Sequence, residues 1–187
     1  MKNRFTYAVL LASALFVNAC QTKQQNAEST SPTDSTEILA ERPGTDPDAP
    51  MSDWMKKLAG SDEGLFRGVN LGDAVAVVKE KEEAEPFEED ASHIGYTIEY
   101  PNLESVDIQY FLDKAKTVSR IEVDIYLNNR PSVDEHLKEL TAYFNRRFGP
   151  SGAQTWKGPG DQPIVLKDVS KGKDFGLKLT FGRMINA

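Results

Sequence analysis

Residues 94–127 read IGYTIEYPNLESVDIQYFLDKAKTVSRIEVDIYL and decide the fold. Apolar residues take every second position in three runs of this stretch, namely 94–100, 106–112 and 121–127. A period of two is typical of β-strands that bury one face and expose the other. Turn-forming residues such as Pro101 separate the runs. The stretch therefore predicts three consecutive antiparallel strands, whose apolar face needs a covering layer.

Two short helices are predicted before these strands. Ser52 is placed to accept hydrogen bonds from the first free amides of a helix that Gly60 ends. Asp73 has the same position before a second helix, residues 74–78. The acidic run 79–90 contains no glycine, which calcium-binding loops require for their turn. We interpret it as a solvated helix end that leads into an edge strand.

The longest helix is predicted after the strands. Ser132 and Glu135 have the spacing of a capping box, in which each side chain binds the other residue's free amide. Apolar residues then recur at helical spacing up to Phe148, and Gly149 ends the helix. Three further strands are expected at 154–157, 164–166 and 175–181.

The resulting element order is helix, three or four strands, helix, three strands. It predicts an α+β fold of two tandem helix-then-antiparallel-strands units, residues 72–127 and 133–181, with the helices packed on one face of the sheet.

The first residues have the features of a secretion signal. Lys2 and Arg4 precede an apolar core that is shorter than the roughly 20 residues of a membrane-spanning helix. Residues 15–20, LFVNAC, resemble the lipobox of bacterial lipoproteins. The resemblance implies that residues 1–19 are a signal peptide, cleaved before a lipidated Cys20. The alternative is an ordinary cleavable signal that contains a cysteine.

A lipidated Cys20 implies attachment to a membrane outside the cytoplasm, since several acyl chains together hold a protein stably. Gln21 follows the cysteine in place of Asp, which in enteric-type sorting implies the outer membrane or its periplasmic face. Residues 20–50 then form the lipid anchor and a disordered tether, because they contain almost no bulky apolar residues. Residues 51–187 are the predicted α+β domain.

The charge of the chain limits its partners. A net charge of −7 over 187 residues argues against nucleic acid and against electrostatic adhesion to anionic lipid. The single cysteine excludes an internal disulfide and a cysteine-based zinc site. The expected partners are the membrane, through Cys20, and another envelope or secreted protein.

The folded part resembles the tandem helix-plus-sheet modules of extracytoplasmic bacterial proteins. The residues that carry this resemblance are FRGVNLGD at 66–73 and the pattern Leu140-x-x-Tyr143-Phe144 before Trp156. Examples are the β-lactamase inhibitory protein type and the small lipoprotein of the outer-membrane assembly machinery. The resemblance spans about residues 65–181 and implies protein binding, but it transfers no contact residue.

The sequence contains no recognisable catalytic motif. His93 lies at the start of a strand, and His136 is expected on the exposed side of the long helix, with Glu139 as its one potential partner ligand there. We therefore expect no metal, no cofactor and no enzymatic activity. A small-ligand binder and an uncharacterised hydrolase remain the alternative functions.

Interaction with a protein partner is expected on the exposed sheet face or on an edge strand. Phe111, Tyr126 and Trp156, together with Tyr110, lie on or near the strands. Any of these aromatic residues that remains exposed is a candidate anchor for a partner.

Overall fold

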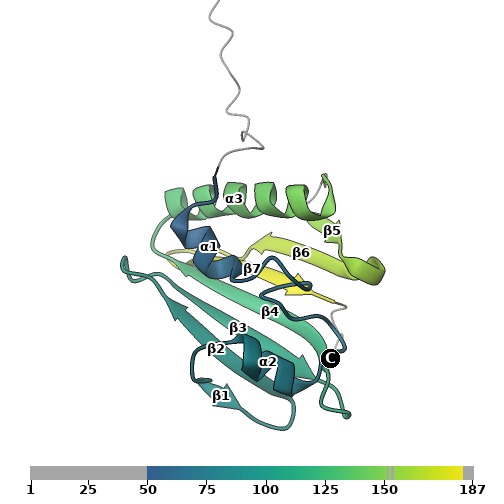
Figure 1. The fold of residues 1–187 in the computed structure, drawn as a ribbon. Coiled ribbons are helices and arrows are strands. Elements are labelled where there is room, and N and C mark those ends of the chain that lie inside the picture. Colours follow the sequence, from purple (N-terminus) through teal and green to yellow (C-terminus); the bar gives the residue numbers. More distant parts are fainter. Residues whose placement is uncertain (1–49, 151, 153, 183–187) are drawn as a thin grey trace, which may run out of the picture. The chain divides into compact units, whose positions relative to one another are not determined.

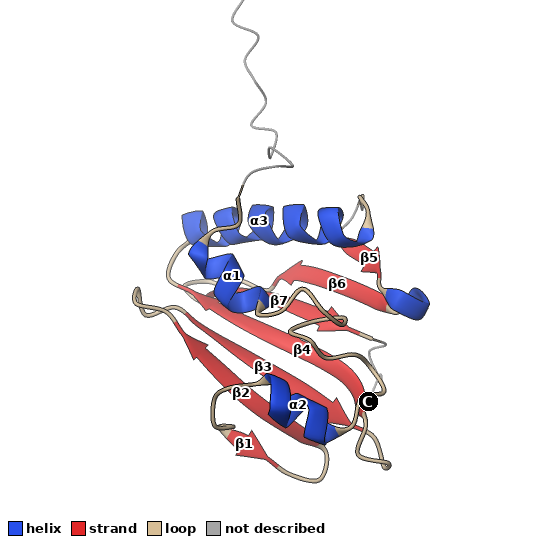
Figure 2. Cartoon of the chain, viewed as in Figure 1, coloured by secondary structure: helices blue, strands red, loops and turns tan. Residues whose placement is uncertain are grey.

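The computed structural model describes residues 50–150, 152 and 154–182, all within one compact unit, Arg42–Ala187. The predicted signal peptide, Cys20 and nearly all of the tether lie outside the described residues. Figures 1 and 2 show the folded part. Its elements in chain order are α1 (Asp53–Ala59), α2 (Val75–Lys81), β1 (Glu88–Glu89), β2 (His93–Glu99), β3 (Ser105–Leu112), β4 (Val118–Leu127), α3 (Arg130–Phe148), β5 (Thr155–Lys157), a 3-10 turn (Pro159–Asp161), β6 (Pro163–Asp168) and β7 (Phe175–Phe181). None of the described helices has the length and apolar content needed to cross a bilayer.

All seven described strands form one antiparallel sheet in the order β1-β2-β3-β4-β7-β6-β5. The first four strands follow one another in sequence and in space. Helix α3 then carries the chain from β4 to the opposite edge at β5, and β6 and β7 return to pair with β4. The α+β class and the expected order of helices and strands are therefore confirmed.

One face of the sheet is apolar, as the sequence alternation predicted. The register places six buried residues in one row across six strands: Ile94, Tyr110, Ile121, Phe181, Ile164 and Trp156. Helix α3 packs against β7 and β5 through Phe144, whose ring centroid lies 5.9 Å from that of Phe181 and 5.1 Å from that of Trp156. This row and its covering side chains are the centre of the core.

The first helix is capped as the sequence predicted. Ser52 Oγ accepts a hydrogen bond from the Met55 amide at 3.0 Å, and Gly60 ends α1 at a φ of 61°, a conformation that favours glycine.

The predicted caps of the other two helices are wrong. Helix α3 begins at Arg130, and its cap is Asn129, whose side chain accepts from the Ser132 amide at 2.9 Å. Asp73 accepts from the Asn70 amide at 2.7 Å and so closes a turn, while α2 begins only at Val75. In both places several residues of capping type stand close together, and the backbone path selects among them.

Candidate functional site

The alternate residues of the strands form a second, partly exposed sheet face, here called the polar face. It is defined by His93, Thr97, Asp107, Phe111, Arg120, Glu122, Asp124, Tyr126 and Lys178. The register aligns Thr97, Asp107, Asp124 and Lys178 in one row over four neighbouring strands. The polar face therefore combines charged and aromatic side chains on a rigid sheet.

The charges of the polar face are paired with one another. Lys178 Nζ lies 2.9 Å from Glu122 Oε2 and 3.0 Å from Asp124 Oδ1. Partial burial alone would lower the pKa of Lys178, but its hydrogen bonds to Glu122 and Asp124 raise the pKa above its usual value. Thr97 donates its hydroxyl to Asp107 at 2.6 Å. The network leaves this face without a dominant sign of charge.

The aromatic residues of the polar face differ in exposure. Phe111 lies between His93, with ring centroids 5.9 Å apart, and the Arg120 guanidinium, 4.0 Å above its ring. Tyr126 is 51% exposed and remains accessible. Phe87, which is 50% exposed, lies over Gly95, where an added Cβ would approach its ring to 2.6 Å.

Trp156 does not share this exposure. It is 4% exposed, lies on the apolar face and donates its indole N–H to Asn145 Oδ1 at 2.9 Å. Tyr110 is completely buried. Trp156 and Tyr110 were candidate anchors only if they remained exposed. Neither is exposed, because the alternation of the strands directs both side chains into the core.

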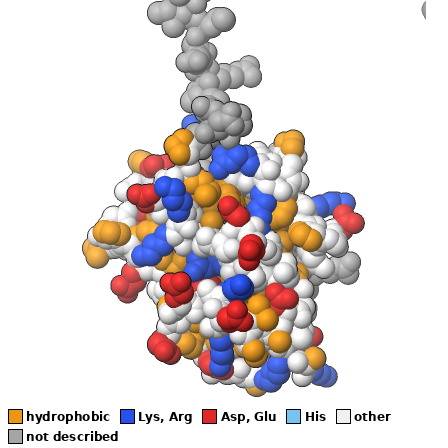
Figure 3. All heavy atoms as spheres, viewed as in Figure 1, with side chains coloured by type: hydrophobic (Ala, Val, Ile, Leu, Met, Phe, Trp, Pro, Cys, Tyr) orange, Lys and Arg blue, Asp and Glu red, His pale blue; other side chains and the backbone are white. Residues whose placement is uncertain are grey.

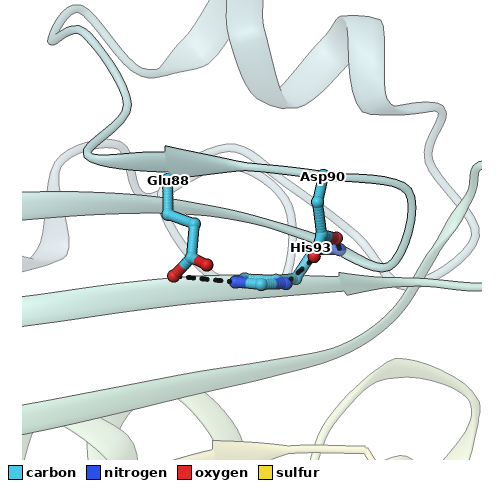
Figure 4. Close-up of side chains that lie close together, drawn as sticks. All are labelled: Glu88, Asp90 and His93. Atoms are coloured by element: carbon cyan, nitrogen blue, oxygen red, sulfur yellow. Dashed lines mark hydrogen bonds and ion pairs between the residues drawn. The ribbon is translucent and has the colours of Figure 1, made fainter.

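His93 lies between two carboxylates at the edge of the sheet (Figure 4). Its Nε2 is 3.3 Å from Glu88, and its Nδ1 is 3.2 Å from Asp90, so the carboxylates occupy opposite ends of the ring. Asp90 also accepts from the backbone and hydroxyl of Ser92, and these bonds lower the pKa of Asp90 to about 2.

The three side chains each offer a ligand atom within 4.8 Å of the others. One metal ion can bind only one nitrogen of the ring, however, and Asp90 is engaged in its turn. The arrangement fits a hydrogen-bonded turn beside a histidine better than a metal centre.

The prediction that His136 is exposed is wrong. Its side chain is 9% exposed and stacks on Trp54 with ring centroids 3.8 Å apart. Its Nε2 lies 3.4 Å from Oε2 of Glu104, a residue that is only 3% exposed. Position 136 lies three residues after Val133 and four before Leu140, which places it on the buried stripe. The helical spacing alone therefore predicts that position 136 is buried. The expectation of exposure came from the polar character of histidine.

Glu104 is the centre of a buried polar cluster. It accepts from the Ser132 hydroxyl and from the Asn128 amide at 3.3 Å. Burial alone would raise the pKa of Glu104, but its hydrogen bonds, first from Ser132 and then from Asn102 and Asn128, lower it, and His136 adds to this effect. A carboxylate beside a histidine can serve in acid–base catalysis. Here both residues are buried, and the Trp54 ring stacks on His136.

A second buried pair joins the N-terminal segment to α2. Arg67 donates Nε and Nη2 to the two oxygens of Glu82, each at 2.7 Å, and Tyr110 donates its hydroxyl to Glu82 at 2.5 Å. Arg67 Nη1 also donates to the carbonyls of Lys57 and Leu58 at the end of α1, both at 2.9 Å. Burial and then the charge of Glu82 raise the pKa of Tyr110 well above its usual value.

Arg67 and Glu82 belong to the lining of a groove of about 930 Å³. Residues 96–99 of β2, residues 83 and 84, which follow α2, and Lys56 and Lys57 of α1 also line it. Figure 3 shows basic and acidic side chains interspersed over the face of the molecule that carries the helices in Figure 1. Sequence reasoning missed this groove because its walls come from segments with no common pattern.

Comparisons of the chain with protein-family models, with curated proteins and with solved structures give no match.

Proposed function

We propose that this chain is a lipid-anchored envelope protein whose folded domain binds another protein and catalyses no reaction. The lipobox-like residues 15–20 support the anchor, through Cys20. The polar face supports the binding function, and the exposed Tyr126 on it is the observation that carries the proposal. Tyrosine is enriched among the residues that contribute most to protein interfaces, because it combines a large apolar area with a polar tip.

We further infer that the domain consists of two tandem units, α2 with β1–β4 and α3 with β5–β7, joined where β4 pairs with β7. The order of the elements and the position of the β4–β7 pair support this division. The position of α1 and α2 in front of the strands in Figure 1 supports helices that cover only the apolar face. The polar face then remains free for a partner.

The two alternative functions have less support. The groove has the volume of a ligand pocket, but seven of the 13 residues that line it are charged, whereas small-ligand pockets are lined mostly by apolar and aromatic side chains. The pair of Glu104 and His136 has the residue types of a hydrolase, but both are buried and neither lines the groove. A protein partner on a flat sheet face requires no enclosed site.

Affinity capture of the full-length lipidated protein from its own membranes tests the proposal. The wild type is expected to recover a defined envelope or secreted protein, and Tyr126→Ala is expected to reduce that recovery by about tenfold, the loss typical of a moderate interface anchor. Leu103→Ala is the matched control, because Leu103 is 91% exposed but lies in the turn between β2 and β3. Recovery of lipid alone, or equal recovery by both variants, contradicts the proposal.

A further inference from the structure

The row of residues that crosses the polar face keeps one charge of each sign without an ion pair. The register extends this row to β6, so that over five neighbouring strands it contains Thr97, Asp107, Asp124, Lys178 and Lys167. Asp124 and Lys178 pair with each other. Asp107 accepts from the uncharged hydroxyl of Thr97, and among the described residues neither Asp107 nor Lys167 has an ion pair. A negative charge on β3 and a positive charge on β6 therefore remain.

The next row of the polar face is apolar and exposed. Tyr126 of β4 lies opposite Gly176 of β7, and the Val169 amide, just after β6, donates to the Gly176 carbonyl at 3.0 Å. Tyr126 is 51% exposed and Val169 is 49% exposed. A Cβ added at Gly176 would lie 3.7 Å from Val169 Cγ2, so the valine side chain is on the same face as the tyrosine ring. The two exposed apolar residues therefore flank a position that has no side chain.

The order of charges in the first row makes the polar face complementary to itself. Identical chains mostly associate about a two-fold axis, and two sheets can stack face to face with their strands nearly aligned. If the axis runs along the strands, between β4 and β7, then β3 of one copy lies over β6 of the other. Asp107 then faces Lys167 of the second copy, and Asp124 faces its Lys178, each contact occurring twice. An axis along the row instead places aspartates over aspartates and lysines over lysines, which is repulsive.

We propose that two copies of this chain associate through their polar faces, about a two-fold axis that runs between β4 and β7. The contacts between Asp107 and Lys167 neutralise the charges that stay unpaired within each chain, and Tyr126 of one copy packs near Val169 of the other. Four strands of about seven residues give a contact of roughly 19 by 23 Å, so the dimer is small and reversible. The inference goes beyond the proposed function, since it needs neither the anchor nor another protein. Because both use Tyr126, the dimer and a complex with another protein exclude each other.

Sedimentation equilibrium of the full-length protein in density-matched detergent tests the dimer. The wild type is expected to show a reversible equilibrium between monomer and dimer. Asp107→Lys and Lys167→Glu are each expected to raise its dissociation constant by at least about tenfold, because each change places two like-charge contacts in the interface. Lys138→Glu, on the exposed side of α3, is the matched control and should leave the constant unchanged. Chains that share a micelle by chance do so equally in all variants.

A mixture of the two charge variants supplies the second arm. The Asp107→Lys chain has a positive side chain at both positions 107 and 167, and the Lys167→Glu chain has a negative one at both. A mixed dimer therefore has opposite charges in both contacts, and the mixture is expected to associate at least as strongly as the wild type. Co-precipitation of differently tagged chains identifies the mixed dimer. A variant that had lost its fold would not regain association on mixing.

Three results would overturn the proposal: a wild type that is monomeric at every concentration, a dimer that both charge reversals leave unchanged, or a mixture that associates no better than its components. If the protein captures an envelope protein from its membranes but sediments as a monomer, the dimer proposal fails while the proposed function stands. If it dimerises as expected but captures no other protein, the proposed function fails while the dimer stands.

Discussion

At the scale of single residues, the buried ion pair of Arg67 and Glu82 attaches the N-terminal segment to the end of α2. Arg67 and Glu82 have side chains 14% and 2% exposed, and together with Tyr110 they satisfy one another's polar groups. Such pairs contribute little compared with apolar packing, but the loss of one partner leaves a buried charge without compensation. The main effect of this pair is to hold the loop that contains Arg67 against the ends of α1 and α2.

Substitution of Glu82 by Gln is therefore expected to lower the free energy of unfolding by about 3 kcal/mol, because the Arg67 charge stays buried without its carboxylate. Urea denaturation measures the change. Glu83→Gln, at the exposed neighbouring position, is expected to stay within about 0.5 kcal/mol of the wild type. If Glu82→Gln also changes the free energy of unfolding by less than about 0.5 kcal/mol, the pair is not needed for stability.

The second residue-scale prediction concerns acid. The folded protein lowers the pKa of Glu104 below its usual 4.5, so folding favours the ionised carboxylate. Its contribution to stability is therefore complete above about pH 4.5 and is lost as the pH falls through the lower, folded pKa. Between pH 7 and pH 3 the wild type should lose more stability than Glu104→Gln, as followed by urea unfolding at each pH. Equal losses would contradict the predicted shift.

At the scale of elements, the join between β4 and β7 holds the two halves of the sheet together. Gly176 of β7 lies opposite Tyr126 of β4, and a Cβ added there would lie 2.7 Å from the Ile125 carbonyl oxygen. A main-chain atom cannot move aside as a flexible side chain can. The strands must therefore separate to accept any larger residue.

Gly176→Ala is expected to destabilise the protein by about 1–3 kcal/mol, the usual cost of overpacking. Thermal or urea unfolding followed by circular dichroism measures it. Gly152→Ala is the matched control, since no atom lies within 4 Å of the Cβ added there and the change should be neutral. An unchanged midpoint in Gly176→Ala would indicate that the strands adjust at no cost.

The sequence predicted the strands better than the contacts between segments. Apolar alternation is a local property, and it located β2, β3 and β4 to within a few residues. The burial of His136 depends on Trp54 of α1, which is 82 positions earlier in the chain, and the pairing of Arg67 with Glu82 depends on the path of a loop. No spacing rule links such residues, so their contacts, and the groove that Arg67 and Glu82 line, were visible only in three dimensions.

At the scale of the whole molecule, the proposed function requires the domain to be held at a membrane. Cys20→Ser is expected to move the protein from the membrane fraction to the soluble fraction, because the acyl chains can no longer be attached. Immunoblotting of membrane and soluble fractions measures the shift, and Ser13→Ala in the predicted signal peptide is the control. A Cys20→Ser protein that stays with the membrane, or a wild type found in the cytosol, would contradict the proposed anchor.

A domain that acts by contact through its polar face must lie against its partner there, and crosslinking in the intact envelope detects that contact. A photoreactive amino acid replaces Tyr126 in the full-length lipidated protein, and position 103 in a control. We expect a discrete light-dependent adduct with another protein from position 126 and not from position 103. No adduct from position 126, or the same diffuse products from both positions, would contradict it.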